Sequence, residues 1–144
     1  MKKSIIALVV VVLAAFLVNT AFAATKCPQP RKTASAPANI AGSDETGKAN
    51  ADNGKAIFHK KAKPMACKMC HGDKGEGDGK LGGALKPKPR NFACAATMKD
   101  ISAGQMFWII KNGSKGTGMA PFKATLKDNE IWDVVKYIRA ELMK

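Results

Sequence analysis

The sequence of 144 residues predicts a small all-α domain with long irregular loops. Three segments in the C-terminal two thirds have helical periodicity, and no segment alternates apolar and polar residues as a half-buried strand would. A stretch rich in glycine and proline separates the first two helical segments. This length provides one small domain without a second core, so multi-domain enzymes, polytopic membrane proteins and collagen-like chains are excluded.

The first 23 residues have the organisation of a secretory signal peptide. Two lysines precede an uninterrupted apolar run over residues 5–18, and the small residues Ala21 and Ala23 suit cleavage after Ala23. The alternative is an uncleaved anchor, because residues 5–24 are just long enough to span the hydrocarbon of a bilayer. In both cases the rest of the chain lies outside the cytoplasm, and we expect a periplasmic protein.

Residues 24–50 are predicted to form a flexible tail. The segment is rich in proline, alanine and serine and contains one large apolar residue, Ile40. Such a segment buries too little surface to offset the loss of chain entropy on folding. The sequence thus divides into a signal peptide at 1–23, a tail at 24–50 and a folded domain at 51–144.

The folded domain contains three helical segments in order. The first is capped by Asp52 or Asn53 and ends before Pro64, and the second covers residues 102–111 and stops at Gly113. The third starts near Asp128 and continues to the C-terminus. Its apolar residues form one stripe of a 3.6-residue period: Ile131, Val134, Val135, Ile138 and Leu142.

The long connection over residues 71–91 indicates that the helices do not form an ordinary core. Three short helices joined by loops of this length bury little apolar surface by themselves. We therefore expect another group to fill the middle of the domain.

Residues 67–71, Cys-Lys-Met-Cys-His, match the C-x-x-C-H pattern of c-type haem attachment. On one helical turn, the sulfurs of Cys67 and Cys70 can form thioethers to the two vinyl groups on one edge of a haem. The next residue, His71, is then placed under the ring as the proximal iron ligand. One covalently bound haem c would supply the missing apolar interior.

Two other kinds of site use the same cysteines. A thioredoxin-like dithiol also has the C-x-x-C spacing, but it requires a βαβ context that this sequence does not show. A structural zinc site requires further ligands, and the remaining Cys27, Cys94 and His59 do not form a second ligand pair.

Met119 is the candidate for the sixth iron ligand. It follows Gly118 and precedes Pro121 in a predicted turn between the second and third helices, and a thioether opposite histidine raises the reduction potential of a haem. Five other methionines compete with it: Met65, Met69, Met98, Met106 and Met143.

From about residue 49 to the C-terminus, the sequence resembles the class I monohaem cytochromes c, in particular the small bacterial periplasmic type. The resemblance implies three to four helices wrapped around one covalently bound haem. It also implies that the first and last helices cross at Gly54 and Phe58 in the first helix, and at Val134 and Tyr137 in the last.

The resemblance implies further roles around the haem. Arg90 and the indole N–H of Trp108 are candidate donors to the propionates. A proline carbonyl commonly orients the haem histidine in this family, and the nearest candidates here are Pro87 and Pro89. The ligand loop departs from the family pattern, because the proline follows Met119 by two positions rather than one.

Cys27 and Cys94 remain outside the haem motif. They can form a disulfide that ties the tail to the domain, which an oxidising compartment permits. The alternative is a lipid-modified Cys27, although Lys26 before it is a poor match for such processing. Membrane contact is expected only if the leader is uncleaved or Cys27 is lipidated.

The chain carries 24 Lys and Arg against 11 Asp and Glu, a net charge of +13. A positive surface around the haem edge favours docking of an acidic redox partner. Export and the lack of aromatic residues among the basic ones argue against nucleic-acid binding. The lysines that flank the haem segments are Lys68, Lys86, Lys88, Lys111, Lys115 and Lys123.

We therefore expect a one-electron carrier that binds no substrate and is not an enzyme, because no base or nucleophile constellation is present. A haem enzyme or gas sensor with an open sixth position is one alternative. A tethered cytochrome subunit of a larger oxidoreductase is another.

Overall fold

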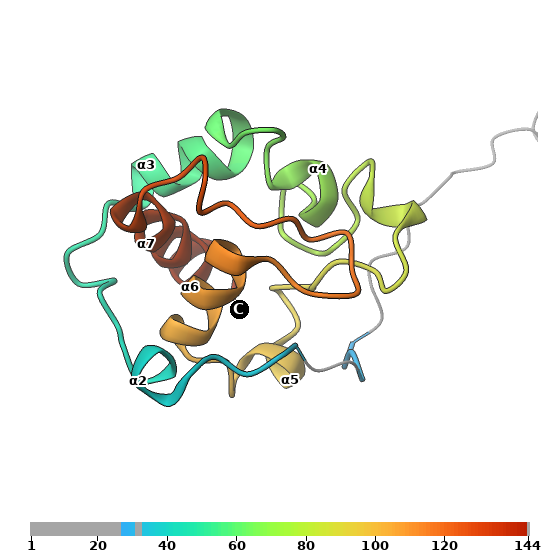
Figure 1. Cartoon of the computed structure of the whole chain (residues 1–144). Coiled ribbons are helices and arrows are strands. Elements are labelled where there is room, and N and C mark those ends of the chain that lie inside the picture. Colours follow the sequence, from blue (N-terminus) through green and yellow to red (C-terminus); the bar gives the residue numbers. More distant parts are fainter. Residues whose placement is uncertain (1–26, 31–32, 144) are drawn as a thin grey trace, which may run out of the picture.

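The computed structural model describes residues 27–30 and 33–143, and the regular elements among them are all helical (Figure 1). The predicted all-α fold is therefore confirmed. The proposed signal peptide and its cleavage site after Ala23 lie outside the described residues. None of the helices in the described ranges is long and apolar enough to span a bilayer.

The first and last helices pack across each other. The first consists of α3 (Ala51–Ala56) and a π-helical turn η1 (Ile57–Lys61), and the last consists of α7 (Asp128–Tyr137) and a second π-helical turn η3 (Ile138–Leu142). Figure 1 shows α7 crossing next to α3. The stripe predicted for the last helix is buried at this crossing and against α6.

The first helix begins slightly earlier than predicted, and the last begins where it was predicted, with its N-cap one residue before Asp128. The side chain of Asn50 caps α3 by accepting a hydrogen bond from the backbone N–H of Asn53 at 3.0 Å. At α7, Lys127 is the N-cap, and its backbone N–H donates to the Glu130 carboxylate at 2.8 Å. Asp128 is thus the first helical residue, and its negative charge interacts favourably with the positive N-terminal end of the helix dipole.

The crossing implied by the family resemblance is present. Gly54 lies directly against the backbone carbonyl of Asp133, and the Phe58 and Tyr137 rings lie 5.5 Å apart. The Asp133 carboxylate fixes the contact, because it accepts hydrogen bonds from the Asn50 backbone N–H at 2.6 Å and the Asn53 side-chain amide at 2.8 Å. A glycine is required here because a β-carbon would overlap the facing backbone.

We expect Gly54→Ala to lower the free energy of unfolding by about 2 kcal/mol. Overpacking costs about 1–3 kcal/mol, whereas alanine in a helix is favoured over glycine by only about 1 kcal/mol. Gly47→Ala is the control, since nothing lies within 4 Å of a β-carbon at Gly47. Urea unfolding of both variants measures the effect, and equal stabilities would contradict the role assigned to the crossing.

The remaining helices complete the domain beside this pair. α6 (Ala103–Asn112) is capped by the Ser102 hydroxyl, as its predicted start requires, and its Phe107 ring stacks on Trp132 of α7 at 4.5 Å. The long connection between η1 and α6 contains three short elements: α4 (Lys68–His71), the 3₁₀ turn η2 (Gly82–Ala84) and α5 (Ala95–Met98).

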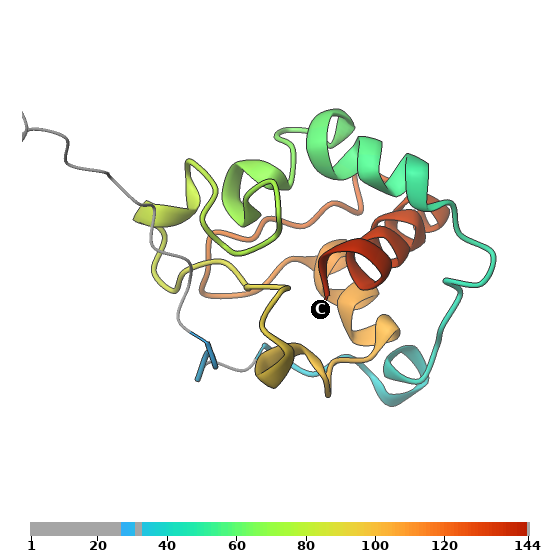
Figure 2. The ribbon, with the colours of Figure 1, turned by 180° about the vertical axis from the view of Figure 1, so that it is seen from behind.

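The flexible tail predicted for residues 24–50 is not what the structure shows for residues 33–50. This segment passes along α5 and α6 and forms a short helix, α2 (Ala38–Ala41), against α6 (Figure 2). The Ala36 backbone N–H donates to the Gln105 side chain at 2.7 Å, and the Ser102 hydroxyl donates to the Ala41 carbonyl at 2.6 Å. Hydrogen bonds, the close contact at Gly104 and the packing of Ile40 against the core hold the segment.

The predicted disulfide between Cys27 and Cys94 is present, with a Cα–Cα distance of 5.7 Å. This distance lies within the usual range for a disulfide. The bond uses the Cys27 sulfur that lipid modification would require. It ties the start of the described chain to the N-cap of α5.

Candidate haem-binding site

The C-x-x-C-H motif forms a single helical turn. Cys67 is the N-cap of α4, and its carbonyl accepts hydrogen bonds from the backbone N–H groups of Cys70 at 3.2 Å and His71 at 2.9 Å. Gly72 ends the turn with a φ of 81°, a conformation that glycine adopts without strain. The turn thus brings two sulfurs and an imidazole close together, as the motif predicts.

A pocket extends from this turn into the middle of the domain. It is concave, partly open to solvent and mostly apolar, as cofactor sites generally are. Cys70 and His71 line it from α4, and the remaining wall is mostly apolar. Its apolar residues include Leu85, Phe92, Met98, Met106, Ile109 and Ile110. The pocket lies beside the core formed by α3, α6 and α7, where a further group was expected.

His71 is held in the state that a metal ligand requires. Its Nδ1 lies 3.0 Å from the backbone carbonyl of Arg90. A carbonyl only accepts hydrogen bonds, so Nδ1 carries the proton and Nε2 keeps its lone pair. Burial lowers the pKa of His71 to about 4, which keeps the ring neutral at pH 7. The Phe92 ring stacks on the imidazole at 4.6 Å with an interplanar angle of 14°.

Met119 enters the same pocket from the connection between α6 and α7. Its backbone carbonyl accepts from the Ser114 N–H at 3.0 Å, and its N–H donates to the Thr117 hydroxyl at 3.0 Å. These bonds fix the turn that presents the side chain. Met119 is partly buried against the core, so its thioether lies among apolar residues.

The family model of cytochrome c matches residues 51–141. The chain belongs to the cytochrome c family. The class I type expected from the sequence is thereby confirmed, and with it a covalently bound c-type haem. Cys67, Cys70 and His71 fit this group by residue type, spacing and protonation state.

A solved structure is also similar, namely a chain of the reducing HAO-like protein complex Kustc0457/Kustc0458 from Kuenenia stuttgartiensis. The two share 28% sequence identity with a TM-score of 0.55, and the match covers 64% of this chain. This cytochrome c spans 43% of that chain, which is less than half of its length. No curated protein matches the sequence.

The cysteines of this cytochrome c do not suit the two other kinds of site. Burial raises the pKa of Cys67 to about 12 and also raises the pKa of Cys70, whereas a thioredoxin-like dithiol has a lowered thiol pKa. Among the described residues, no three side chains of His, Cys, Asp or Glu cluster as zinc ligands would. Haem attachment is therefore the use that the motif supports.

The structure excludes three of the five competing methionines from the lining of the pocket. Met98 and Met106 line the pocket together with Met119, whereas Met65, Met69 and Met143 are not among the lining residues. The Met106 sulfur lies 4.0 Å from the Arg139 guanidinium, which donates to it. Met98 is 2% exposed and packs within the core, so Met119 remains the best candidate.

Of the two candidate propionate donors, Arg90 and Trp108, the structure places only Arg90 in the lining of the pocket. The backbone carbonyl of Arg90 makes the contact with His71 Nδ1. The group that orients His71 is therefore the carbonyl of the residue after Pro89, and neither Pro87 nor Pro89 itself makes this contact. Trp108 lies on α6 outside the pocket lining, so the structure does not place it at the site.

Sequence reasoning did not identify two residues that lie at or next to the site. Phe92, which stacks on His71, is the only aromatic residue between His71 and Phe107. Its isolation in a polar stretch is the signal that could have identified it. The other is Gln29, whose side chain bonds to Pro89 and Asn91 on either side of Arg90; it lies in the predicted tail and has no local signal.

Proposed function

We propose that this protein is a periplasmic one-electron carrier with a single covalent haem ligated by His71 and Met119. The observation that carries the proposal is the hydrogen bond between His71 Nδ1 and the Arg90 carbonyl, which leaves the Nε2 lone pair available in the same apolar pocket as Met119. A haem with both axial positions occupied exchanges one electron with little change in bonding.

In this proposal each residue has a defined task. Cys67 and Cys70 would hold the haem covalently, and His71 and Met119 would supply a nitrogen and a sulfur ligand to its iron. The Arg90 carbonyl orients the imidazole, and the apolar wall excludes water from the iron. None of these residues acts as an acid, base or nucleophile towards a substrate, so the proposed role is transfer and not catalysis.

A subunit of a larger oxidoreductase is the second candidate function. The observation that favours it is the similarity to a chain that is itself part of a protein complex. In that case the haem domain would pass electrons within an assembly rather than between diffusing partners. Size-exclusion chromatography of the native membrane and periplasmic fractions distinguishes the two functions. A free carrier elutes at the size of the single chain, and a subunit elutes at the size of a larger complex.

Docking of an acidic redox partner is supported by lysines near the pocket. Lys88 is exposed and lines the pocket, and Lys86, Lys115 and Lys123 are also exposed. Lys68 and Lys111 are less suited to docking, because they pair with Asp73 at 3.1 Å and Asp128 at 2.8 Å. The docking surface is thus proposed to consist of Lys86, Lys88, Lys115 and Lys123.

We expect the rate of electron exchange with an acidic redox protein to fall about tenfold or more as salt rises. The Debye length shrinks from about 30 Å at 0.01 M to about 8 Å at 0.15 M, which screens long-range steering. Stopped-flow absorbance measures the second-order rate constant. Lys88→Glu should lower it at low salt, whereas Lys55→Glu, exposed on α3 outside the pocket lining, should change it less. A rate independent of salt would refute electrostatic docking.

A further inference from the structure

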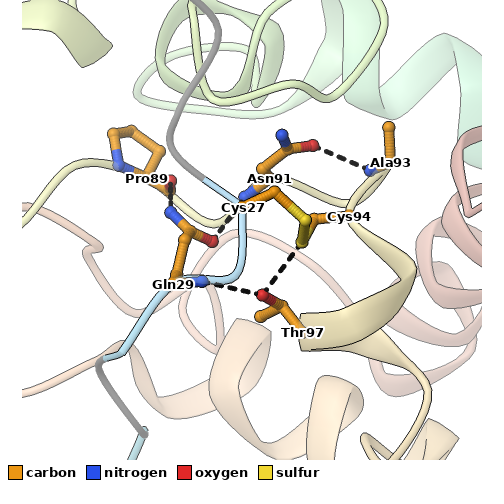
Figure 3. Close-up of a disulfide and its surroundings, with 7 residues drawn as sticks. All are labelled: Cys27, Gln29, Pro89, Asn91, Ala93, Cys94 and Thr97. Carbon is orange, nitrogen blue, oxygen red and sulfur yellow. Dashed lines mark hydrogen bonds between the residues drawn. A yellow bond between two sulfur atoms is a disulfide. The ribbon is translucent and has the colours of Figure 1, made fainter.

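The start of the described chain lies against the segment that orients His71 (Figure 3). The disulfide of Cys27 with Cys94 anchors it. Two residues later, the Gln29 backbone N–H donates to the Thr97 hydroxyl at 3.0 Å. The Gln29 side chain is thereby directed towards residues 89–91, as Figure 3 shows.

The Gln29 amide bonds to both neighbours of Arg90. Its Nε2 donates to the Pro89 carbonyl at 2.9 Å, and its Oε1 accepts from the Asn91 backbone N–H at 2.9 Å. These two bonds hold the peptide groups on either side of Arg90. The Arg90 carbonyl belongs to the second of these peptide groups, the one whose Asn91 N–H donates to Gln29, and it accepts from His71 Nδ1.

Residues 85–94, which carry this carbonyl, are held by side-chain and long-range backbone hydrogen bonds and not by the ladder of a helix. They form no helix between η2 and α5, and the prolines at 87 and 89 lack the backbone N–H that would anchor them. On the far side, the Phe92 N–H donates to the Gly75 carbonyl at 2.7 Å. On the N-terminal side of Phe92, the side chain of Gln29 holds the backbone through its hydrogen bonds to Pro89 and Asn91.

We infer that Gln29 is a positioning residue for the axial ligand His71. It fixes the Arg90 carbonyl, and through it the direction and strength of the hydrogen bond at His71 Nδ1. A stronger bond at this nitrogen makes the imidazole a better donor to a metal. The disulfide keeps Gln29 in place, so the N-terminal segment contributes to the electronic properties of the site. The inference rests on the ligand role of His71 in the proposed function.

The test uses the mature, haem-loaded protein and the variant Gln29→Ala. We expect the His71 Nδ1 proton to exchange with solvent about tenfold faster, as measured by NMR of the ferrous protein. We also expect the reduction potential to shift upwards, because a weaker donor stabilises the ferric state less. Gln29→Glu keeps the acceptor for the Asn91 N–H but loses the donor to the Pro89 carbonyl. Its Nδ1 exchange rate should therefore lie between those of the wild type and Gln29→Ala.

Ser102→Ala is the matched control. It removes the bond to Ala41 and the cap of α6, and so loosens the same N-terminal segment without touching residues 89–91. We expect its Nδ1 exchange rate and potential to match those of the wild type. A general loss of stability would change the Nδ1 exchange rate in Ser102→Ala and in the Gln29 variants alike. A positioning role changes the exchange rate and the reduction potential only in the Gln29 variants.

The inference is overturned if Gln29→Ala is folded and its Nδ1 exchange and potential equal those of the wild type. Should Gln29→Ala not fold, the same two measurements on Gln29→Glu decide between the outcomes. A wild-type protein that lacks His71 ligation would instead refute the proposed function. The two failures are therefore distinguishable in one set of spectra.

Discussion

The Cys67→Ser/Cys70→Ser double variant is expected to be exported colourless and without the native fold. Haem attachment requires both sulfurs, and without the bound group the apolar walls of the pocket would face water. An unfilled interior of this kind costs several kcal/mol, comparable with the whole stability of a small domain, about 5–15 kcal/mol. Visible absorbance and far-UV circular dichroism of the periplasmic fraction measure the two effects.

The matched control is Cys27→Ser/Cys94→Ser, which removes the other two cysteines. This variant should keep its colour and helical content, because these residues lie outside the haem motif. Its free energy of unfolding should fall by about 4 kcal/mol at most, the value for a disulfide that closes a loop of this length. The assignment fails if the first variant carries covalent haem, or if the control is the one that loses it.

Met119→Ala is expected to open the sixth coordination position. The ferric protein should lose the long-wavelength absorption band of methionine-to-iron ligation, and the ferrous protein should gain the ability to bind carbon monoxide. The reduction potential should fall, because methionine as axial ligand raises it. Met65→Ala is the control, since Met65 is exposed and outside the pocket lining.

Two results would lead to other conclusions about the site. If Met119→Ala keeps the band and Met98→Leu loses it, the axial ligand comes from α5 and not from the loop after α6. If the wild-type protein itself lacks the band and binds carbon monoxide, a haem enzyme or gas sensor becomes the favoured function. Both measurements use the same purified proteins.

Local sequence patterns predicted the features that depend on neighbours in the chain. The stripe from Ile131 to Leu142 predicted the buried face of the last helix, and Ser102 predicted the start of α6. The C-x-x-C-H spacing predicted the turn that presents Cys67, Cys70 and His71, because all three residues lie within residues 67–71, which form a single helical turn.

The features that sequence reasoning missed depend on contacts between distant parts of the chain. Residues 33–50 pack against α6 through single hydrogen bonds to residues more than 60 positions away, and composition alone predicted a tail. The same holds for the contact of the Arg90 carbonyl with His71 and for the contact of Gln29 with Pro89, both of which form only in the folded chain. Trp108 was assigned by family resemblance alone, and helix rotation places it outside the pocket lining.

The mass of the intact exported protein, with its pyridine haemochrome spectrum, tests the central claim most directly. We expect the mass of the chain from Ala24 plus one haem that acid solvent does not extract, and the spectrum of a haem with both vinyl groups saturated. A protein that is folded and exported but colourless would contradict the account. Haem that extracts freely would contradict attachment at Cys67 and Cys70.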